Sequence, residues 1–120
     1  MNVNLFGCLA EYKFAVMAME YGINVSFPLI HSSPYDCIIE TKKVLKKIQI
    51  KAISTGKDKA RCYLLDSNRN AYKKEDVDFF AVWVQYHNGF YIFKNENLNK
   101  TMVINKGGIY SKNFNNFAML

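Results

Sequence analysis

The chain has 120 residues and a net charge of +6, and half of its residues are apolar. A chain of this size and composition can bury one hydrophobic core, so we expect a single domain over residues 1–120. No apolar run approaches the roughly 20 residues that cross a bilayer, and the first residues lack a signal-peptide pattern. The three cysteines form no CxxC pair, which disfavours a disulfide framework or a thiolate zinc site. These features predict a soluble protein of a reducing, cytoplasmic compartment, with its cysteines as small core residues.

Basic residues concentrate in the middle of the chain. Eight of the sixteen lysines and arginines lie between positions 42 and 61, where Asp58 is the only acidic residue. A local excess of positive charge attracts a polyanion, and nucleic acid is the obvious candidate. A lysine-rich hairpin that only keeps the protein soluble would give the same pattern. The residues that we assign to a DNA-binding surface are Lys42, Lys43, Lys46, Lys47, Lys57, Lys59 and Arg61.

Residues 5–21 are predicted to form the first element, an α-helix. They contain no proline, their apolar residues recur at three- and four-residue spacing, and Gly22 follows as a stop signal. Glu11 falls on a helical stripe of small and apolar residues: Gly7/Cys8, Phe14/Ala15 and Ala18. A carboxylate in that position either serves a function or lies at the margin of the stripe and reaches water.

Two strands are expected next, after a short extended piece at 25–27. Residues 35–40 and 45–53 read as strands, and in the second one Ile48 and Ile50 alternate with Gln49 and Lys51. A turn centred between Lys42 and Lys43 would set Asp36 opposite Gln49, with Lys51 on the same face. Two lysines are poor residues for a tight primed turn, and a longer loop would shift this register.

The second half of the chain is predicted to be rich in strands. Residues 61–65 form the next candidate strand, and the nearly continuous apolar run 79–84 is typical of a central strand that is covered on both faces. Asn88-Gly89 predicts a hairpin with a type I′ turn leading into the strand 90–93. The last strand candidate is 102–104.

The predicted hairpin collects groups suited to phosphodiester hydrolysis. That reaction needs a metal to activate water and to offset charge on the phosphate, and usually a cation beside the developing charge. Asp36 and Glu11 offer the hard carboxylate oxygens that Mg²⁺ prefers. Gln49 could supply an amide oxygen or orient a water molecule, and Lys51 could polarise the nucleophile or stabilise the pentacoordinate phosphate. Glu11, Asp36, Gln49 and Lys51 are therefore the candidate catalytic residues.

These residues, in this order, resemble the core of the PD-(D/E)xK nucleases. The resemblance rests on the helix with Glu11, on Pro34-Tyr35-Asp36 and on Ile48-Gln49-Ile50-Lys51, and it extends weakly to about residue 93. Within that superfamily the chain looks most like the small intron-encoded homing endonucleases, and next most like Holliday-junction resolvases. Gln49 stands where most members have Glu or Asp, which removes one anionic ligand and raises the importance of Glu11.

The resemblance implies an α/β (α+β) fold in which helices flank a mixed central β-sheet, as in restriction endonucleases. It also implies a site-specific, Mg²⁺-dependent endonuclease acting on double-stranded DNA, with Mn²⁺ as a substitute metal. The implied metal ligands are Glu11, Asp36, Gln49 and the Ile50 carbonyl, and Lys51 is the implied catalytic cation. A Holliday-junction resolvase and a non-catalytic basic DNA-binding module, in which Lys51 only contacts phosphate, are the alternatives.

Several residues are interpreted as structural. His31 and His87 lack metal-ligand spacing and are assigned surface or capping roles, and the aromatic residues near 79–93 are assigned to the core. Cutting both strands in one encounter needs two sites related by symmetry, so we expect a homodimer or homotetramer. The apolar residues of the tail 109–120 are the candidate subunit contact: Tyr110, Phe114, Phe117, Met119 and Leu120.

Overall fold

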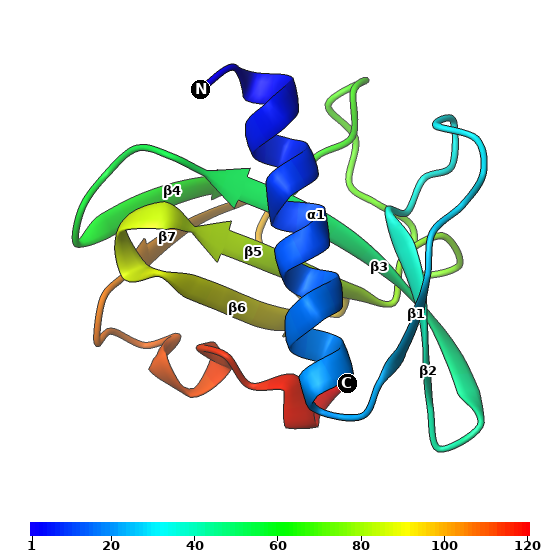
Figure 1. Ribbon diagram of the computed structural model, residues 1–120. Coiled ribbons are helices and arrows are strands. Elements are labelled where there is room, and N and C mark those ends of the chain that lie inside the picture. Colours follow the sequence, from blue (N-terminus) through cyan, green and yellow to red (C-terminus); the bar gives the residue numbers. More distant parts are fainter.

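The computed structural model describes residues 1–120 as a mixed α+β fold (Figure 1). The elements are α1 (Val3–Glu20), β1 (Asn24–Ser26), β2 (Cys37–Thr41), β3 (Val44–Ile53), β4 (Lys59–Tyr63), β5 (Phe79–Val84), β6 (Gly89–Lys94) and β7 (Thr101–Asn105). Short 3-10 turns lie at Gln85–His87, Ser111–Asn113 and Phe117–Met119. No helix is long and apolar enough to cross a membrane.

A five-stranded sheet forms the centre of the molecule, in the order β1-β2-β3-β5-β6. The pairing of β3 with β5 is parallel and the other pairings are antiparallel, so the predicted mixed sheet is confirmed. Every residue of β5 is buried, as its continuous apolar run predicted. α1 is the only α-helix, and it covers one face of the sheet.

The other face is covered by strands instead of helices. β4 and β7 pair in a separate two-stranded sheet that packs on the central sheet through a second apolar cluster. Cys62 lies in this second cluster, and Cys37 lies in the cluster under α1. Burial raises the pKa of Cys62 to about 11 and that of Cys37 to about 12, so both behave as inert core thiols. Cys8 is exposed, contrary to the expectation that all three cysteines lie in the core.

The helix α1 starts where Asn2 caps it, because the Asn2 side chain accepts a hydrogen bond from the Leu5 N–H at 2.8 Å. Its buried face consists of Ala10, Phe14, Ala15 and Ala18. Glu11 is half-buried beside that face, so it lies at the margin of the apolar stripe, which was the alternative interpretation.

The β2–β3 hairpin has the predicted register. β2 ends at Thr41 and β3 begins at Val44, so the turn consists of Lys42 and Lys43, which adopt φ of 50° and 65°. Those values fit a primed turn, although lysine is rarely used there. The resulting pairing of Cys37 with Ile48 preserves the predicted alignment.

The second hairpin differs from the prediction in its turn. Val84 pairs with Gly89, and the loop between them contains a 3-10 turn followed by Asn88 in the left-handed region with φ of 54°. Gly89 lies in β6, and a Cβ on it would come within 2.4 Å of the Phe114 ring. Glycine is therefore required here by the close approach of the tail and not by a type I′ turn.

The tail packs on its own subunit, so its apolar composition is explained without a subunit contact. Phe117 is 2% exposed and stacks between Phe14 and Tyr21 of the α1 region. Phe114 packs on Tyr91, and Tyr110 packs on Phe93. Phe114, Phe117 and Tyr110 pack on aromatic residues of the same chain, so they do not require a partner chain.

Candidate active site

The candidate site lies where β2 and β3 separate. Regular pairing ends at Cys37, because the Asp36 N–H donates to the Ile48 carbonyl at 2.8 Å instead of continuing opposite Gln49. The Asp36 carboxylate then accepts a hydrogen bond from the Ile50 N–H at 2.7 Å. Asp36 thus caps an edge of β3 that no neighbouring strand covers. The predicted direct pairing of Asp36 with Gln49 is replaced by this arrangement.

All four candidate catalytic side chains line one cavity at this edge. The cavity has a volume of about 220 Å³, and the first turns of α1 form its other wall. Its lining residues are Val3, Phe6, Gly7, Glu11, Asp36, Gln49, Ile50, Lys51 and Ala52. The sequence had assigned these functional groups to three separate elements, and the fold brings them together.

Both carboxylates have a raised pKa. Burial raises the pKa of Glu11, the Asp36 charge raises it further, and the exposed His31 partly opposes both effects. Burial also raises the pKa of Asp36, although the hydrogen bond from Ile50 and the charge of Lys51 oppose that rise. Glu11 makes no hydrogen bond or ion pair within the chain. A carboxylate pair of this kind, half-buried and lacking a protein cation on Glu11, is favourable for binding a cation.

The residues present fit a Mg²⁺ ion in their chemistry. Glu11 and the second oxygen of Asp36 have no protein partner, and both are hard oxygen donors. The N–H and C=O of one strand residue point to the same edge, so the Ile50 carbonyl faces the same opening as its N–H. Gln49, whose side chain carries an amide oxygen, also lines the cavity. No third His, Cys, Asp or Glu joins the pair in a metal-binding group.

Lys51 extends from β3 toward the loop that follows β4. Its Nζ donates hydrogen bonds to the Leu65 carbonyl and the Tyr72 hydroxyl, each at 3.1 Å. It also lies 5.0 Å from the centre of the Tyr72 ring. Lys51 lines a further cavity of about 310 Å³ together with Arg61, so a basic groove leads away from the site.

The structure divides the predicted DNA-binding residues into separate groups. Lys42 and Lys43 form the turn before β3, whereas Lys57 and Lys59 follow its other end. Arg61 lines a cavity beside residues 51–53 at that second end, so most of a ten-residue strand separates the two groups. Lys46 lies over the Phe79 ring, and Lys47 donates to the Glu75 carbonyl, so both are engaged within the chain. The basic segment is therefore not one continuous patch.

Sequence reasoning missed three neighbours of the site. His31 lines a second cavity, of about 260 Å³, together with Glu11 and Asp36. Tyr72 and the Leu65 carbonyl bind Lys51. The loops that carry these groups have no periodicity, so no pattern in the sequence linked them to the hairpin. His87, assigned to the surface or a cap, is buried and bridges the Tyr91 hydroxyl and the Lys57 carbonyl at 2.8 and 2.7 Å.

Comparison with known proteins agrees with this geometry. The fold is similar to that of the bacterial homing endonuclease I-Ssp6803I, with a TM-score of 0.84 and 18% identity over 99% of this chain and 93% of that one. It is also similar to Hjc, a Holliday junction resolvase from the archaeal hyperthermophile Archaeoglobus fulgidus, with a TM-score of 0.54 and 12% identity over 84% of each chain. No curated protein sequence matches the chain. Residues 1–107 match the family described as PD-(D/E)XK endonuclease, and the chain therefore belongs to that family.

Proposed function

We propose that the chain is a Mg²⁺-dependent endonuclease that hydrolyses phosphodiester bonds in duplex DNA at specific sites. The observation that carries the proposal is the convergence of Glu11, Asp36, Gln49 and Lys51 on one cavity at the open edge of β3. Site specificity is the finer part of the proposal. It is supported by the likeness to a bacterial homing endonuclease over nearly the whole of both chains.

The proposed division of labour follows from the contacts. Glu11, Asp36, the Ile50 carbonyl and Gln49 would hold the Mg²⁺, with Mn²⁺ as a substitute. The bound metal would supply an activated water and offset negative charge on the phosphate. Water attacks phosphorus, one P–O ester bond breaks, and the departing oxygen takes up a proton. Lys51, the one cation lining this cavity, stabilises the extra negative charge on the pentacoordinate phosphate.

DNA is proposed to follow the groove between Lys51 and Arg61. Lys57 and Lys59 lie close to Arg61 in the chain and are exposed. None of these side chains is paired with an acid, because the single side-chain ion pair of the molecule joins Lys94 to Glu96 at 3.3 Å. They are therefore free to neutralise phosphates. Lys42 and Lys43, at the far end of β3, are left out of this surface.

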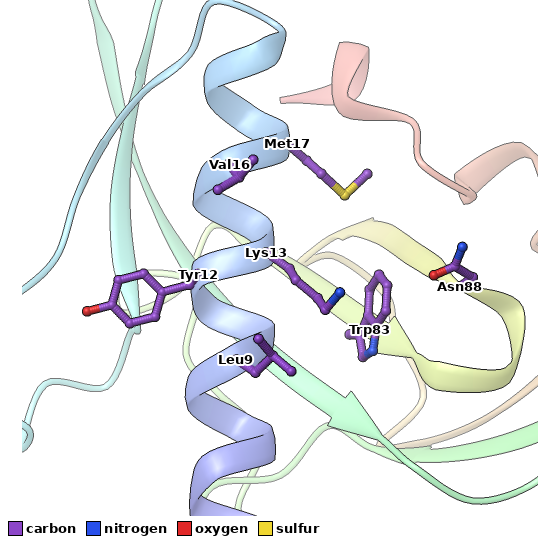
Figure 2. A pocket seen from close by; sticks show the side chains of 7 residues that line it. All are labelled: Leu9, Tyr12, Lys13, Val16, Met17, Trp83 and Asn88. Atoms are coloured by element: carbon purple, nitrogen blue, oxygen red, sulfur yellow. The ribbon is translucent and has the colours of Figure 1, made fainter.

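A symmetric homo-oligomer is the proposed assembly, and α1 is its proposed contact. An apolar stripe on α1 faces solvent and consists of Leu5, Leu9, Tyr12, Val16 and Met19, which are 38–60% exposed. Figure 2 shows the groove beside it, where Lys13 reaches over Trp83 while Tyr12 and Val16 point away from that ring. The stripe holds no charged residue, so it can meet its own copy across a two-fold axis without burying an unpaired charge.

Cleavage of three DNA substrates by the full-length protein tests the proposed activity. Mg²⁺-dependent cleavage of a linear duplex carrying the target sequence, with weaker cleavage of four-way junctions and single strands, is the expected result. Preferential cleavage of the junction would instead identify a resolvase, the alternative that the likeness to the archaeal enzyme supports. Salt-dependent binding without cleavage of any substrate would identify a non-catalytic DNA-binding module.

A further inference from the structure

The ammonium group of Lys51 is held by groups outside the candidate metal site. Its Nζ donates to the Leu65 carbonyl and to the Tyr72 hydroxyl at 3.1 Å each, and it lies 5.0 Å from the Tyr72 ring centre. We propose that Tyr72 is a positioning residue that, together with the Leu65 carbonyl, fixes the Lys51 ammonium for contact with the scissile phosphate. This inference rests on the proposed function, because it assigns Lys51 the role of catalytic cation.

The number of donors on the ammonium group makes this arrangement useful. A lysine ammonium has three N–H donors, and two of them are taken by Leu65 and Tyr72. One N–H remains available in the cavity that contains Asp36 and Glu11. A free lysine side chain would have to lose its rotamer freedom when the phosphate binds, whereas this one is already ordered. The Leu65 carbonyl, the Tyr72 hydroxyl and the Tyr72 ring are electron-rich groups, which suits a residue that acts as a cation.

Tyr72 is itself held firmly, as a positioning residue must be. Its ring meets the Phe80 ring nearly edge-on, with centroids 5.5 Å apart and planes at 68°. Its backbone carbonyl accepts a hydrogen bond from Asn95 Nδ2 at 3.2 Å, and the same nitrogen donates to the Val77 carbonyl at 2.9 Å. The strand β6, which ends just before Asn95, thereby anchors the loop that carries Tyr72.

The Leu65 carbonyl, which is the other acceptor for Lys51, is held in place by a turn between Leu65 and Tyr72. Leu65 and Ala71 form an isolated β-bridge. Within that bridge, the Asp66 side chain accepts hydrogen bonds from the N–H groups of Asn68 and Asn70, each at 2.9 Å. The segment 65–72 is thus closed by its own hydrogen bonds, and it presents a carbonyl and a hydroxyl to the same ammonium group.

Tyr72→Phe isolates the hydroxyl, because phenylalanine keeps the ring against Phe80 and beneath Lys51. Under single-turnover conditions we expect the variant to cleave about 10-fold more slowly, with unchanged DNA affinity, KM and thermal midpoint. Tyr86→Phe is the matched control, because Tyr86 is exposed and does not contact Lys51. A Tyr72→Phe variant that cleaves at the native rate would overturn the inference.

A second measurement follows the ammonium group without relying on activity. In ¹H–¹⁵N spectra of the lysine side chains, the Nζ signal of Lys51, assigned with Lys51→Arg, should be protected from solvent exchange in the native protein. It should broaden in Tyr72→Phe and persist in Tyr86→Phe. An unchanged Lys51 signal in Tyr72→Phe would overturn the inference.

Lys51→Ala distinguishes failure of this inference from failure of the proposed function. If Lys51→Ala loses cleavage while Tyr72→Phe retains the native rate, only the positioning role is wrong. If Lys51→Ala cleaves normally, both the catalytic assignment of Lys51 and the positioning role of Tyr72 are wrong. Loss of activity in Lys51→Ala together with partial loss in Tyr72→Phe supports both.

Discussion

Burial and the neighbouring Asp36 charge raise the pKa of Glu11, so its ionised form destabilises the metal-free protein at neutral pH. Glu11→Gln should therefore raise the thermal midpoint modestly in the absence of Mg²⁺ while reducing cleavage about 100-fold or more. The experiment is thermal unfolding of both proteins in chelator, together with a cleavage assay.

The stability difference between Glu11→Gln and the native protein should depend on pH, because folding raises the pKa of Glu11. A carboxyl group whose pKa is raised by folding binds its proton more tightly in the folded state, so the cost of ionisation is present above the raised pKa. The difference in stability between Glu11→Gln and the native protein should become smaller as pH falls through the raised pKa of Glu11. It should vanish below the ordinary glutamate pKa of 4.5. A native protein that is more stable than the variant at neutral pH would contradict this interpretation.

Gln49 is the one uncharged side chain among the four candidate catalytic residues. Gln49→Glu places a third carboxylate beside Glu11 and Asp36, so we expect tighter binding of divalent metal and a changed preference between Mg²⁺ and Mn²⁺, with cleavage retained. Metal titration followed by calorimetry and cleavage in each metal measure this. Unfolding of the variant would instead identify Gln49 as structural.

The four candidate catalytic side chains could be proposed from the sequence because local rules placed them. Strand alternation placed Gln49 and Lys51 on one face, and the hairpin register brought Asp36 near them, although Asp36 contacts Ile50 and does not pair with Gln49. Tyr72, Leu65 and His31 could not be predicted, since each reaches the site through an irregular loop whose path depends on tertiary packing. The roles of all these residues remain predictions.

At the scale of elements, the hairpins show where turn rules succeed and where they fail. The tight β2–β3 turn formed despite its two lysines, because the apolar residues Ile39 and Ile48 must face α1, and that requirement fixes the register. Asn88-Gly89 has a strong turn signal, yet the loop is longer because Gly89 is needed beneath the Phe114 ring. Contacts that are remote in sequence overrode local preference at both turns.

The element that follows β3 is predicted to bind the DNA backbone. Arg61→Gln should lower the slope of log affinity against log salt by about 0.9, the loss of one phosphate contact. The matched control is Lys42→Asn combined with Lys43→Gly, which removes two charges from the far end of β3. This control should leave the slope unchanged and stabilise the protein by about 1 kcal/mol, because asparagine and glycine suit the positive φ at those positions.

Fluorescence anisotropy with a labelled duplex over a range of salt concentrations measures these slopes. If the slope of log affinity against log salt is lower in the Lys42→Asn/Lys43→Gly variant and unchanged in Arg61→Gln, DNA follows the Lys42–Lys43 end instead.

At the scale of the whole molecule, the sequence predicted a mixed sheet but not what covers its second face. β4 and β7 are far apart in the chain, and their pairing has no signal in either strand alone. The position of the tail was missed for a related reason. Its apolar residues indicated that it must pack somewhere, but composition does not distinguish a contact within one chain from a contact between copies.

The proposed assembly is tested on the exposed stripe of α1. Val16→Arg combined with Met19→Arg should convert the oligomer into a monomer, because each copy would bury new like charges across the two-fold axis. Ile109→Arg is the control: Ile109 is 84% exposed in the tail and should tolerate the charge without dissociation. Analytical ultracentrifugation at micromolar concentration measures the mass. An oligomer that survives the α1 variant but not the tail variant would return the contact to the tail.

Asp36 and Lys51 are proposed to carry out metal-dependent hydrolysis of DNA at the open edge of β3. The most direct measurement is Mg²⁺-dependent cleavage of duplex DNA by the native protein, Asp36→Ala and Lys51→Ala, with DNA binding and circular dichroism measured on the same samples. We expect a loss of about 100- to 1,000-fold or more in the cleavage rate of each variant, while both remain folded and retain most of their DNA affinity. Cleavage at the native rate by either folded variant would contradict the account.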